Sequence, residues 1–186
     1  MADVPVIAGP AVARALLAGW QTRWRAPADS PLSRCVPGDR LIVREACIPG
    51  RIRDGGEVMT DLVRAEFVVF PDGWRRYRDG SGRNGTLPRD ANEKWIAAVH
   101  MPRWAVRIAL IVERGRIEPV QAITRGGLCG EGLRPLLGGL VWRAPTHGVG
   151  LSPRRLYARR WNLDHPTPGC RWQDNPSTIV LDVRRA

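Results

Sequence analysis

Glu45 and Glu131 are the two acidic residues of this sequence whose surroundings suit acid–base chemistry. Glu45 follows the apolar run R-L-I-V-R at residues 40–44, and Glu131 lies in the glycine-rich stretch G-L-C-G-E-G. A carboxylate in either setting can act as a general base or as a cation ligand. Because solvent-facing carboxylates are commoner, catalysis at these residues is a hypothesis. No Ser-His-Asp or Cys-His pattern has supporting context, and no P-loop is present.

Tryptophan and arginine are neighbours along much of the chain. The segment A-G-W-Q-T-R-W-R-A-P at residues 18–27 is one example. Six of the eight tryptophans adjoin an arginine: Trp24, Trp74, Trp104, Trp142, Trp161 and Trp172. This pattern is typical of single-strand binders, in which arginine contacts phosphate and the ring stacks on a base. A core tryptophan beside a solvent-facing arginine gives the same pattern, but for the whole set we favour binding.

The cysteines and histidines do not form a metal-binding pattern. Cys35, Cys47, Cys129 and Cys170 include no C-x-x-C pair, and their spacings fit no common zinc module. We expect buried or idle thiols in a reducing compartment. We expect no dedicated metal site and no other cofactor. A loosely bound divalent cation is the one alternative that stays open.

The charge balance points to a polyanionic partner. The chain has 29 Lys+Arg against 18 Asp+Glu, a formal net charge of +11, and Lys94 is its only lysine. Such a balance attracts nucleic acid, and arginine binds phosphate in a forked geometry, although a GC-rich genome produces the same arginine bias. No run approaches 18 apolar residues, so no membrane span is expected. The first residues do not resemble a secretory signal, which makes the cytoplasm the expected location.

Hydrophobic periodicity predicts an α+β fold. Short helices are expected at 10–19 and 153–161, and strands at 40–46, 58–70 (with a turn near Asp61), 105–113, 116–123 and 177–184. A polar segment at about 71–94 and a glycine-rich loop at about 125–150, with one helical turn near 132–137, would interrupt them. The prediction is a single domain over 1–186, a small mixed or antiparallel β-barrel with a few short flanking helices.

Several segments, taken in order, resemble ASCH-domain proteins of the PUA-like superfamily, in the form common in phages and prophages. They are A-G-W-Q-T-R-W-R, P-G-D-R-L-I-V-R-E, R-Y-R-D-G, H-M-P-R-W-A-V-R-I, E-G and N-P before the last strand. In that form the fourth segment typically reads H-M-P-R-W-A-S-R-I, so 100–108 match with one change. The resemblance covers nearly the whole chain.

The resemblance implies a PUA-like β-barrel with a cleft beside the first helix. Members of the superfamily bind RNA or modified bases, some ASCH proteins are amidohydrolases acting on acetylated cytidine, and some are ribonucleases. The family hallmark is G-x-K-x-x-T-x-R after the first helix. Its lysine and threonine, with a glutamate from a later loop, form the amidohydrolase site.

The hallmark is degenerate in this chain. Gly19 matches the glycine, and Glu131 before Gly132 matches the later glutamate. The other positions differ: Gln21 replaces the lysine, Trp24 the threonine and Ala26 the arginine, with Arg25 one place early. A glutamine cannot act as a base or a cation, and an indole cannot replace a hydroxyl. We therefore expect the amidohydrolase mechanism to be lost and the cleft to suit stacking.

Three functional hypotheses follow. The leading one is a nucleic-acid-binding module, for RNA rather than DNA or for a modified or flipped base, whose contacts would come from Arg23, Trp24, Arg25, Arg44, Arg103, Trp104 and Arg107. The second is a hydrolase, a ribonuclease or nucleoside amidohydrolase, with Glu45 and Glu131 as its catalytic acid and base. The third is a phage accessory protein that binds a host protein. The sequence does not indicate an oligomeric state.

Overall fold

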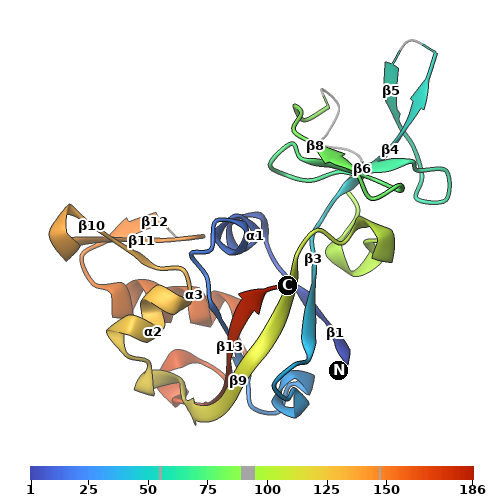
Figure 1. Cartoon of the computed structure of the whole chain (residues 1–186). Coiled ribbons are helices and arrows are strands. Elements are labelled where there is room, and N and C mark those ends of the chain that lie inside the picture. Colours follow the sequence, from blue (N-terminus) through green and yellow to red (C-terminus); the bar gives the residue numbers. More distant parts are fainter. Residues whose placement is uncertain (55, 89–94, 147) are drawn as a thin grey trace. The chain divides into compact units, whose positions relative to one another are not determined.

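The computed structural model describes residues 1–54, 56–88, 95–146 and 148–186 (Figure 1). By contact density the chain forms two compact units, each described by itself below. Unit 1 comprises Met1–Val4, Ala15–Leu41 and Leu110–Ala186, and unit 2 comprises Pro5–Arg14 and Ile42–Ala109. The predicted polar segment at about 71–94 lies in unit 2, with 89–94 outside the described residues. The predicted glycine-rich loop lies in unit 1.

Short helices and many strands make up the chain. The α-helices are α1 (Pro10–Leu17), α2 (Arg125–Gly130) and α3 (Pro153–Asp164). The 3-10 helices are η1 (Pro31–Arg34), η3 (Ala98–His100), η4 (Arg103–Ala105), η5 (Val120–Ala122), η6 (Leu137–Gly139) and η7 (Trp172–Asp174). The strands are β1 (Asp3–Ile7), β2 (Arg23–Pro27), β3 (Arg40–Arg44), β4 (Ile48–Arg53), β5 (Gly56–Met59), β6 (Phe67–Val69), β7 (Arg75–Tyr77), β8 (Gly82–Arg83), β9 (Ala109–Pro119), β10 (Arg134–Leu136), β11 (Val141–Ala144), β12 (Gly148–Gly150) and β13 (Ser177–Arg185). The predicted α+β class is confirmed.

The strands form three sheets. Their orders are β1-β3-β9-β13-β2, β10-β11-β12 and β5-β4-β6-β7-β8. None of these orders closes on itself among the described residues, so the predicted barrel is not confirmed. No helix of the described residues is long and apolar enough to span a membrane.

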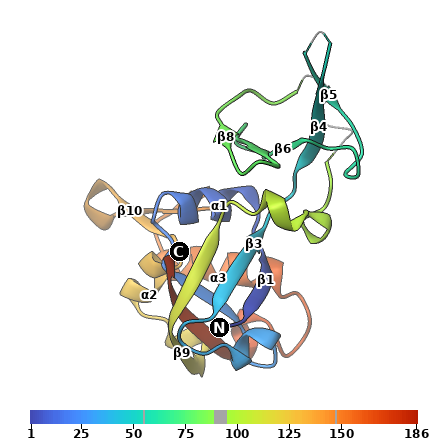
Figure 2. The same cartoon turned by 45° about the vertical axis from the view of Figure 1, so that its right-hand side comes forward.

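Within unit 1, β13 lies between β9 and β2 and is antiparallel to both (Figure 2). The register places Thr178 opposite Glu118 and Pro27, and Val180 opposite Arg116 and Arg25. Because side chains alternate along strands, these residues share one face of the sheet. The predicted strands at 105–113 and 116–123 are one strand, β9, which starts after η4 and ends at Pro119, where the ladder loses a donor.

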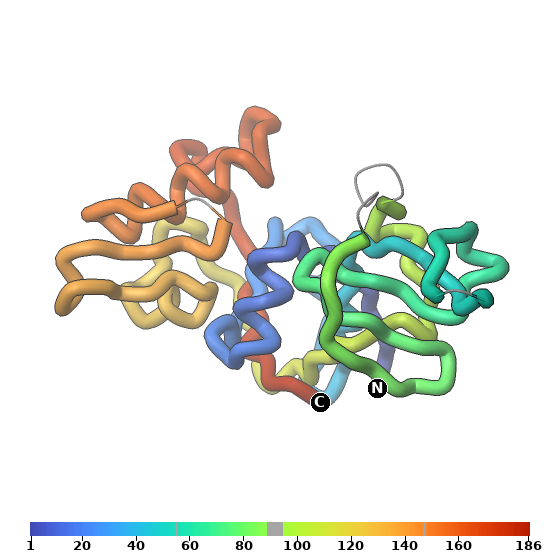
Figure 3. The backbone as a smooth tube through the Cα atoms, turned by 90° about the horizontal axis from the view of Figure 1, so that it is seen from above, coloured from blue at the N-terminus to red at the C-terminus, as the bar shows by residue number. Residues whose placement is uncertain are grey.

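The prediction of a glycine-rich loop at about 125–150 is wrong, because this stretch folds into α2 and the antiparallel sheet β10-β11-β12. Figure 3 shows the three strands as neighbouring orange tubes. Trp142 and Ala144 on β11 face inward and join Leu156 and Tyr157 of α3 in one buried cluster. Glycines with positive φ, such as Gly138 at 68°, make the turns between short strands and hide their periodicity.

The last helix, α3, begins as predicted. Ser152 caps it by accepting a hydrogen bond from the Arg155 amide, and Pro153 occupies its first turn. The helix buries Leu156, Tyr157 and Trp161 and runs to Asp164, beyond the predicted end at 161. Through these side chains the helix packs against the β10-β11-β12 sheet.

The sheet of unit 2 is antiparallel, with β4 paired to β5 and β6, and β7 paired to β6 and β8. Its buried residues fall into two groups. One is Ile48, Phe67 and Val69, and the other is Cys47, Val68, Phe70, Met101 and Ala105. The predicted interruption near Asp61 separates β5 from β6. The predicted polar segment contributes β7 and β8, so part of it is paired strand.

Candidate functional site

Glu131 is the centre of a buried cluster of charged and polar side chains in unit 1. It follows α2, and its side chain is only 4% exposed. Arg25 Nε donates to one of its carboxylate oxygens at 2.7 Å, and the Tyr157 hydroxyl donates to the other at 2.5 Å. Burial, and then the charge of Glu131, raise the pKa of Tyr157 well above its usual value. Both oxygens of Glu131 are therefore occupied by partners from the protein itself.

Arg25 connects this cluster to the first sheet. Its side chain is 1% exposed, and it donates to Glu118 at 2.7 Å and to the hydroxyl of Thr178 at 2.9 Å. Burial by itself lowers the pKa of Arg25, but the charge of Glu131 and the hydrogen bonds outweigh burial, so the pKa is raised. Arg25 is thus a buried cation whose three nitrogens all donate to groups of the protein itself. The phosphate contact predicted at this residue would have to replace one of these hydrogen bonds.

The ion pairs continue across the same face of β2, β13 and β9. Arg23 donates to Asp182 at 2.6 Å, while Arg116 donates to Asp182 at 2.9 Å and to Glu118 at 3.1 Å. We call these residues the ion-pair ladder: Arg23, Asp182, Arg116, Glu118, Arg25 and Glu131. Its three arginines balance its three carboxylates, so it presents no excess positive charge to a polyanion.

Three of the predicted nucleic-acid contacts, Arg23, Trp24 and Arg25, do not lie on one surface. These residues lie on strand β2, opposite Asp182, Leu181 and Val180 respectively. Since strand side chains alternate, Trp24 points to the other side of the sheet from both arginines. The residues that the sequence groups together are separated because they belong to a strand.

Gln21 and Glu131 do lie side by side, as the family resemblance implies for the hallmark position and the later glutamate. Their backbones form an antiparallel bridge, and both side chains are buried. Gln21 Nε2 donates to the Arg23 carbonyl at 3.1 Å, while Oε1 has no hydrogen-bond partner among the described residues. The two positions are therefore adjacent, but no cation faces Glu131 from residue 21.

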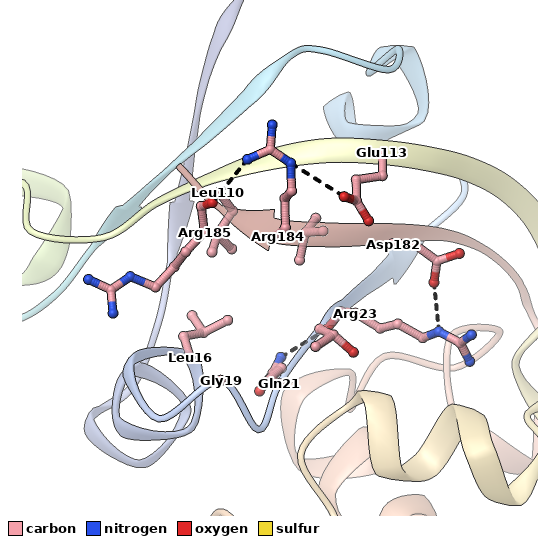
Figure 4. Close-up of a pocket in the computed structure, with 11 residues that line it drawn as sticks. Leu16, Gly19, Gln21, Arg23, Leu110, Glu113, Asp182, Arg184 and Arg185 are labelled. Atoms are coloured by element: carbon pink, nitrogen blue, oxygen red, sulfur yellow. Dashed lines mark hydrogen bonds and ion pairs between the residues drawn. The ribbon is translucent and has the colours of Figure 1, made fainter.

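A cavity of about 530 Å³ opens beside the end of α1, within unit 1 (Figure 4). Its polar lining comes from Gln21, Arg23, Glu113, Asp182, Arg184 and Arg185. Figure 4 shows Arg23 paired with Asp182, and Arg184 paired with Glu113 at 3.4 Å. Glu131 does not line this cavity. The cavity therefore offers paired donors and acceptors, without the predicted catalytic glutamate.

Glu45 occupies a similar position in unit 2. Two nitrogens of Arg107 donate hydrogen bonds to its carboxylate, at 2.7 and 2.8 Å, and a third donates to Asp72 at 2.8 Å. The Arg107 guanidinium also lies 4.0 Å from the centre of the Phe70 ring. Burial by itself lowers the pKa of Arg107, but its bonds to Glu45 and Asp72 outweigh burial and raise it. The cavity at this pair, about 50 Å³, is too small for a nucleotide.

The remaining predicted contacts are nearer the surface of unit 2. Arg44 donates to the Val99 carbonyl at 2.7 Å, and Arg103 is exposed in η4. Trp104 is half-buried, with the Arg78 guanidinium 5.1 Å from its ring centre. Burial, followed by the charge of Glu45, raises the pKa of nearby Cys47 to about 12, so this thiol is inert.

Tryptophan–arginine stacking occurs, but not between sequence neighbours. The observed pairs in the described residues are Trp104 with Arg78, Trp142 with Arg125, Trp20 with Arg134 and Trp172 with Arg154. Adjacent residues on a strand face opposite ways, which is why Trp142 is buried while Arg143 is exposed.

Sequence reasoning missed Glu118 and Thr178, which contact Arg25, and Tyr157, which contacts Glu131. It also missed Asp182, which pairs with Arg23 and Arg116. The Y-x-x-x-W spacing of α3 does indicate an inward-facing Tyr157. The three strand residues carry no such signal, because only the register of β9, β13 and β2 brings Glu118 and Thr178 to Arg25 and Asp182 to Arg23.

The described residues contain no group of three or more potential metal ligands. No family model matches the chain, and no curated protein matches it. Among solved structures, the chain is similar to one described as hypothetical protein PH0355, with a TM-score of 0.43 and 7% identity over 100% of both chains.

Proposed function

We propose that this protein is a nucleic-acid-binding module of the ASCH type, acting in the cytoplasm, with RNA favoured over DNA as its partner. We also propose that the chain is related to PUA-like proteins, on the basis of the sequence segments given above. It rests on the distribution of charge rather than on a catalytic centre.

One observation carries the proposal. Residues 121–172 contain eight arginines and only two acidic residues, Glu131 and Asp164. Glu131 belongs to the ion-pair ladder, and among the described residues Asp164 pairs only with Arg160, at 3.9 Å. Arg125, Arg143, Arg154, Arg155 and Arg159 are all exposed. Unneutralised exposed arginines on one stretch of a domain are the electrostatic footprint of a polyanion-binding surface.

The hydrolase hypothesis is weaker on the same geometry. A general base must reach the proton that it removes. Glu131 is buried, and both its oxygens accept internal hydrogen bonds. Glu45 is likewise held by two nitrogens of Arg107. Neither carboxylate is available to a substrate without breaking an ion pair.

The cavity beside α1 supports a role in holding a nucleoside. Its volume, about 530 Å³, lies in the range of small-molecule sites. Arginine donors and aspartate acceptors are the groups that recognise base edges. Their charges largely cancel inside the cavity, so the cavity suits a neutral base better than a phosphate.

The direct experiment is a binding and turnover screen of the purified protein. RNA, single-stranded DNA, duplex DNA and modified nucleosides are offered with and without a divalent cation. We expect RNA to bind most tightly, with no turnover. Hydrolysis of a probe would favour the enzyme hypothesis. No binding of any nucleic acid at low salt, with one stable protein partner in a pull-down, would favour the host-protein hypothesis.

A further inference from the structure

The β10-β11-β12 sheet has one covered face and one open face. Trp142 and Ala144 of β11 point to the covered face, toward α3. Their neighbours Val141 and Arg143 must point the other way. Arg143 is exposed, and Val149, its partner on β12, is 58% exposed. The outer face is therefore open within unit 1.

Two arginines lie directly opposite each other on this open face. The register pairs Arg134 of β10 with Arg143 of β11. Like charges in a direct cross-strand pair repel each other and destabilise a sheet. Neither arginine forms an ion pair with a carboxylate among the described residues. The arrangement costs stability in the free protein and becomes favourable when a phosphate lies between or above the two guanidinium groups.

An exposed tryptophan lies against one of these two arginines. The bridge between Gln21 and Glu131 brings the segment that follows α1 alongside the segment that leads into β10. Trp20 lies there, 53% exposed, with the Arg134 guanidinium 5.4 Å from its ring centre. An indole this open is costly to leave in water, and its flat surface suits stacking with a base.

We propose that the open face formed by Trp20, Arg134, Arg143 and Val149, the sheet platform, binds single-stranded RNA. A base stacks on Trp20, and the adjoining phosphates contact Arg134 and Arg143. A duplex keeps its bases stacked on one another, so the indole selects the single strand. This inference rests on the proposed nucleic-acid function and assigns it to a surface other than the cavity beside α1.

The test measures anisotropy of a labelled RNA of about 12 nucleotides, a length within known single-strand sites, and of the same RNA as a duplex. The platform variants are Trp20→Leu and Arg143→Gln, both at exposed positions. Trp20→Phe retains an aromatic ring. Arg34→Gln is the matched charge control, because Arg34 is exposed on η1 and η1 lies away from this sheet (Figures 1 and 2).

We expect wild type to prefer the single strand, Trp20→Leu and Arg143→Gln each to weaken it about tenfold, and Trp20→Phe and Arg34→Gln to stay within about twofold of wild type. If wild type binds RNA but the platform variants bind equally well, or if the duplex binds as tightly as the single strand, the platform is overturned while the proposed function stands. If wild type binds no RNA, both fail.

Discussion

Arginine occurs in opposite circumstances in two regions of unit 1. In the ion-pair ladder, every arginine has a carboxylate partner, and Arg25 is almost completely buried. On the sheet platform, Arg134 and Arg143 face each other, and neither has a carboxylate partner among the described residues. The overall basic charge therefore does not by itself locate a binding surface. Charge that neighbouring acids cancel holds the fold together, and only uncancelled charge can attract a polyanion.

The largest expected effect is from Glu131→Ala. The change leaves the buried Arg25 guanidinium without one of its two carboxylate partners and the Tyr157 hydroxyl without its acceptor. Breaking a buried pair from one side costs about 3–5 kcal/mol in the free energy of unfolding. Urea denaturation followed by tryptophan fluorescence measures it. Asp164→Ala removes the same charge at an exposed position and should cost less than about 0.5 kcal/mol. Equal stabilities for the two variants would contradict a structural role for Glu131.

Arg107→Met should have the next largest effect. It leaves the buried Glu45 carboxylate without its two donors, and we expect a loss of about 3 kcal/mol. The control Arg53→Met removes an exposed arginine of the same unit. If adding Glu45→Gln to Arg107→Met recovers no stability in the double variant, the cost does not come from an uncompensated carboxylate.

Glu118→Gln tests the ion-pair ladder through the pH dependence of stability. Burial by itself raises the pKa of Glu118, but hydrogen bonds and charge from Arg25 and Arg116 outweigh it, so the folded-state pKa is lowered. A carboxyl with a lowered pKa contributes stability above its unfolded value, about 4.3, and loses it as the pH falls through the folded value. The variant should be about 1 kcal/mol less stable than wild type at pH 7. This gap should shrink in acid; a gap that stays constant from neutral to strongly acidic pH would contradict the pairing.

The smallest effect on stability is expected from Arg143→Gln. Arg143 lies opposite the like-charged Arg134 on one side and Val149 on the other, and it has no carboxylate partner among the described residues. Its removal should therefore leave the free energy of unfolding within about 0.5 kcal/mol of wild type or raise it. Thermal unfolding at low salt, where the repulsion between the two arginines is strongest, shows whether the variant is more or less stable than wild type. A loss above 1 kcal/mol, on the order of a cap or buried hydrogen bond, would mean that Arg143 has a structural partner.

Elements with strong local signals could be predicted from the sequence. Pro10 and Gly19 delimit α1, Ser152 and Pro153 start α3, and the alternation of Ile179, Leu181 and Val183 gives β13. The β10-β11-β12 sheet was missed, since its strands have three or four residues each and are separated by glycines. Short strands depend on packing against α3, which no local pattern reveals.

The candidate site was predictable only in part. Residues 21 and 131 are neighbours through a backbone bridge, and the family resemblance, itself still a prediction, assigns both positions to one site. It could not indicate that Arg25 saturates Glu131, because that contact depends on which way each residue of β2 faces. The same alternation separates Trp24 from Arg23. Trp20 and Arg134 come together through the bridge at Gln21, which likewise depends on the register.

The most direct test of the account is the salt dependence of wild-type affinity for single-stranded RNA. Each phosphate contact by an uncancelled arginine releases a counterion and adds about −0.7 to the slope of log affinity against log salt. With several such contacts, affinity should fall at least about tenfold between roughly 50 and 200 mM salt. An affinity that stays flat over this range would contradict the claim that uncancelled arginines bind the polyanion.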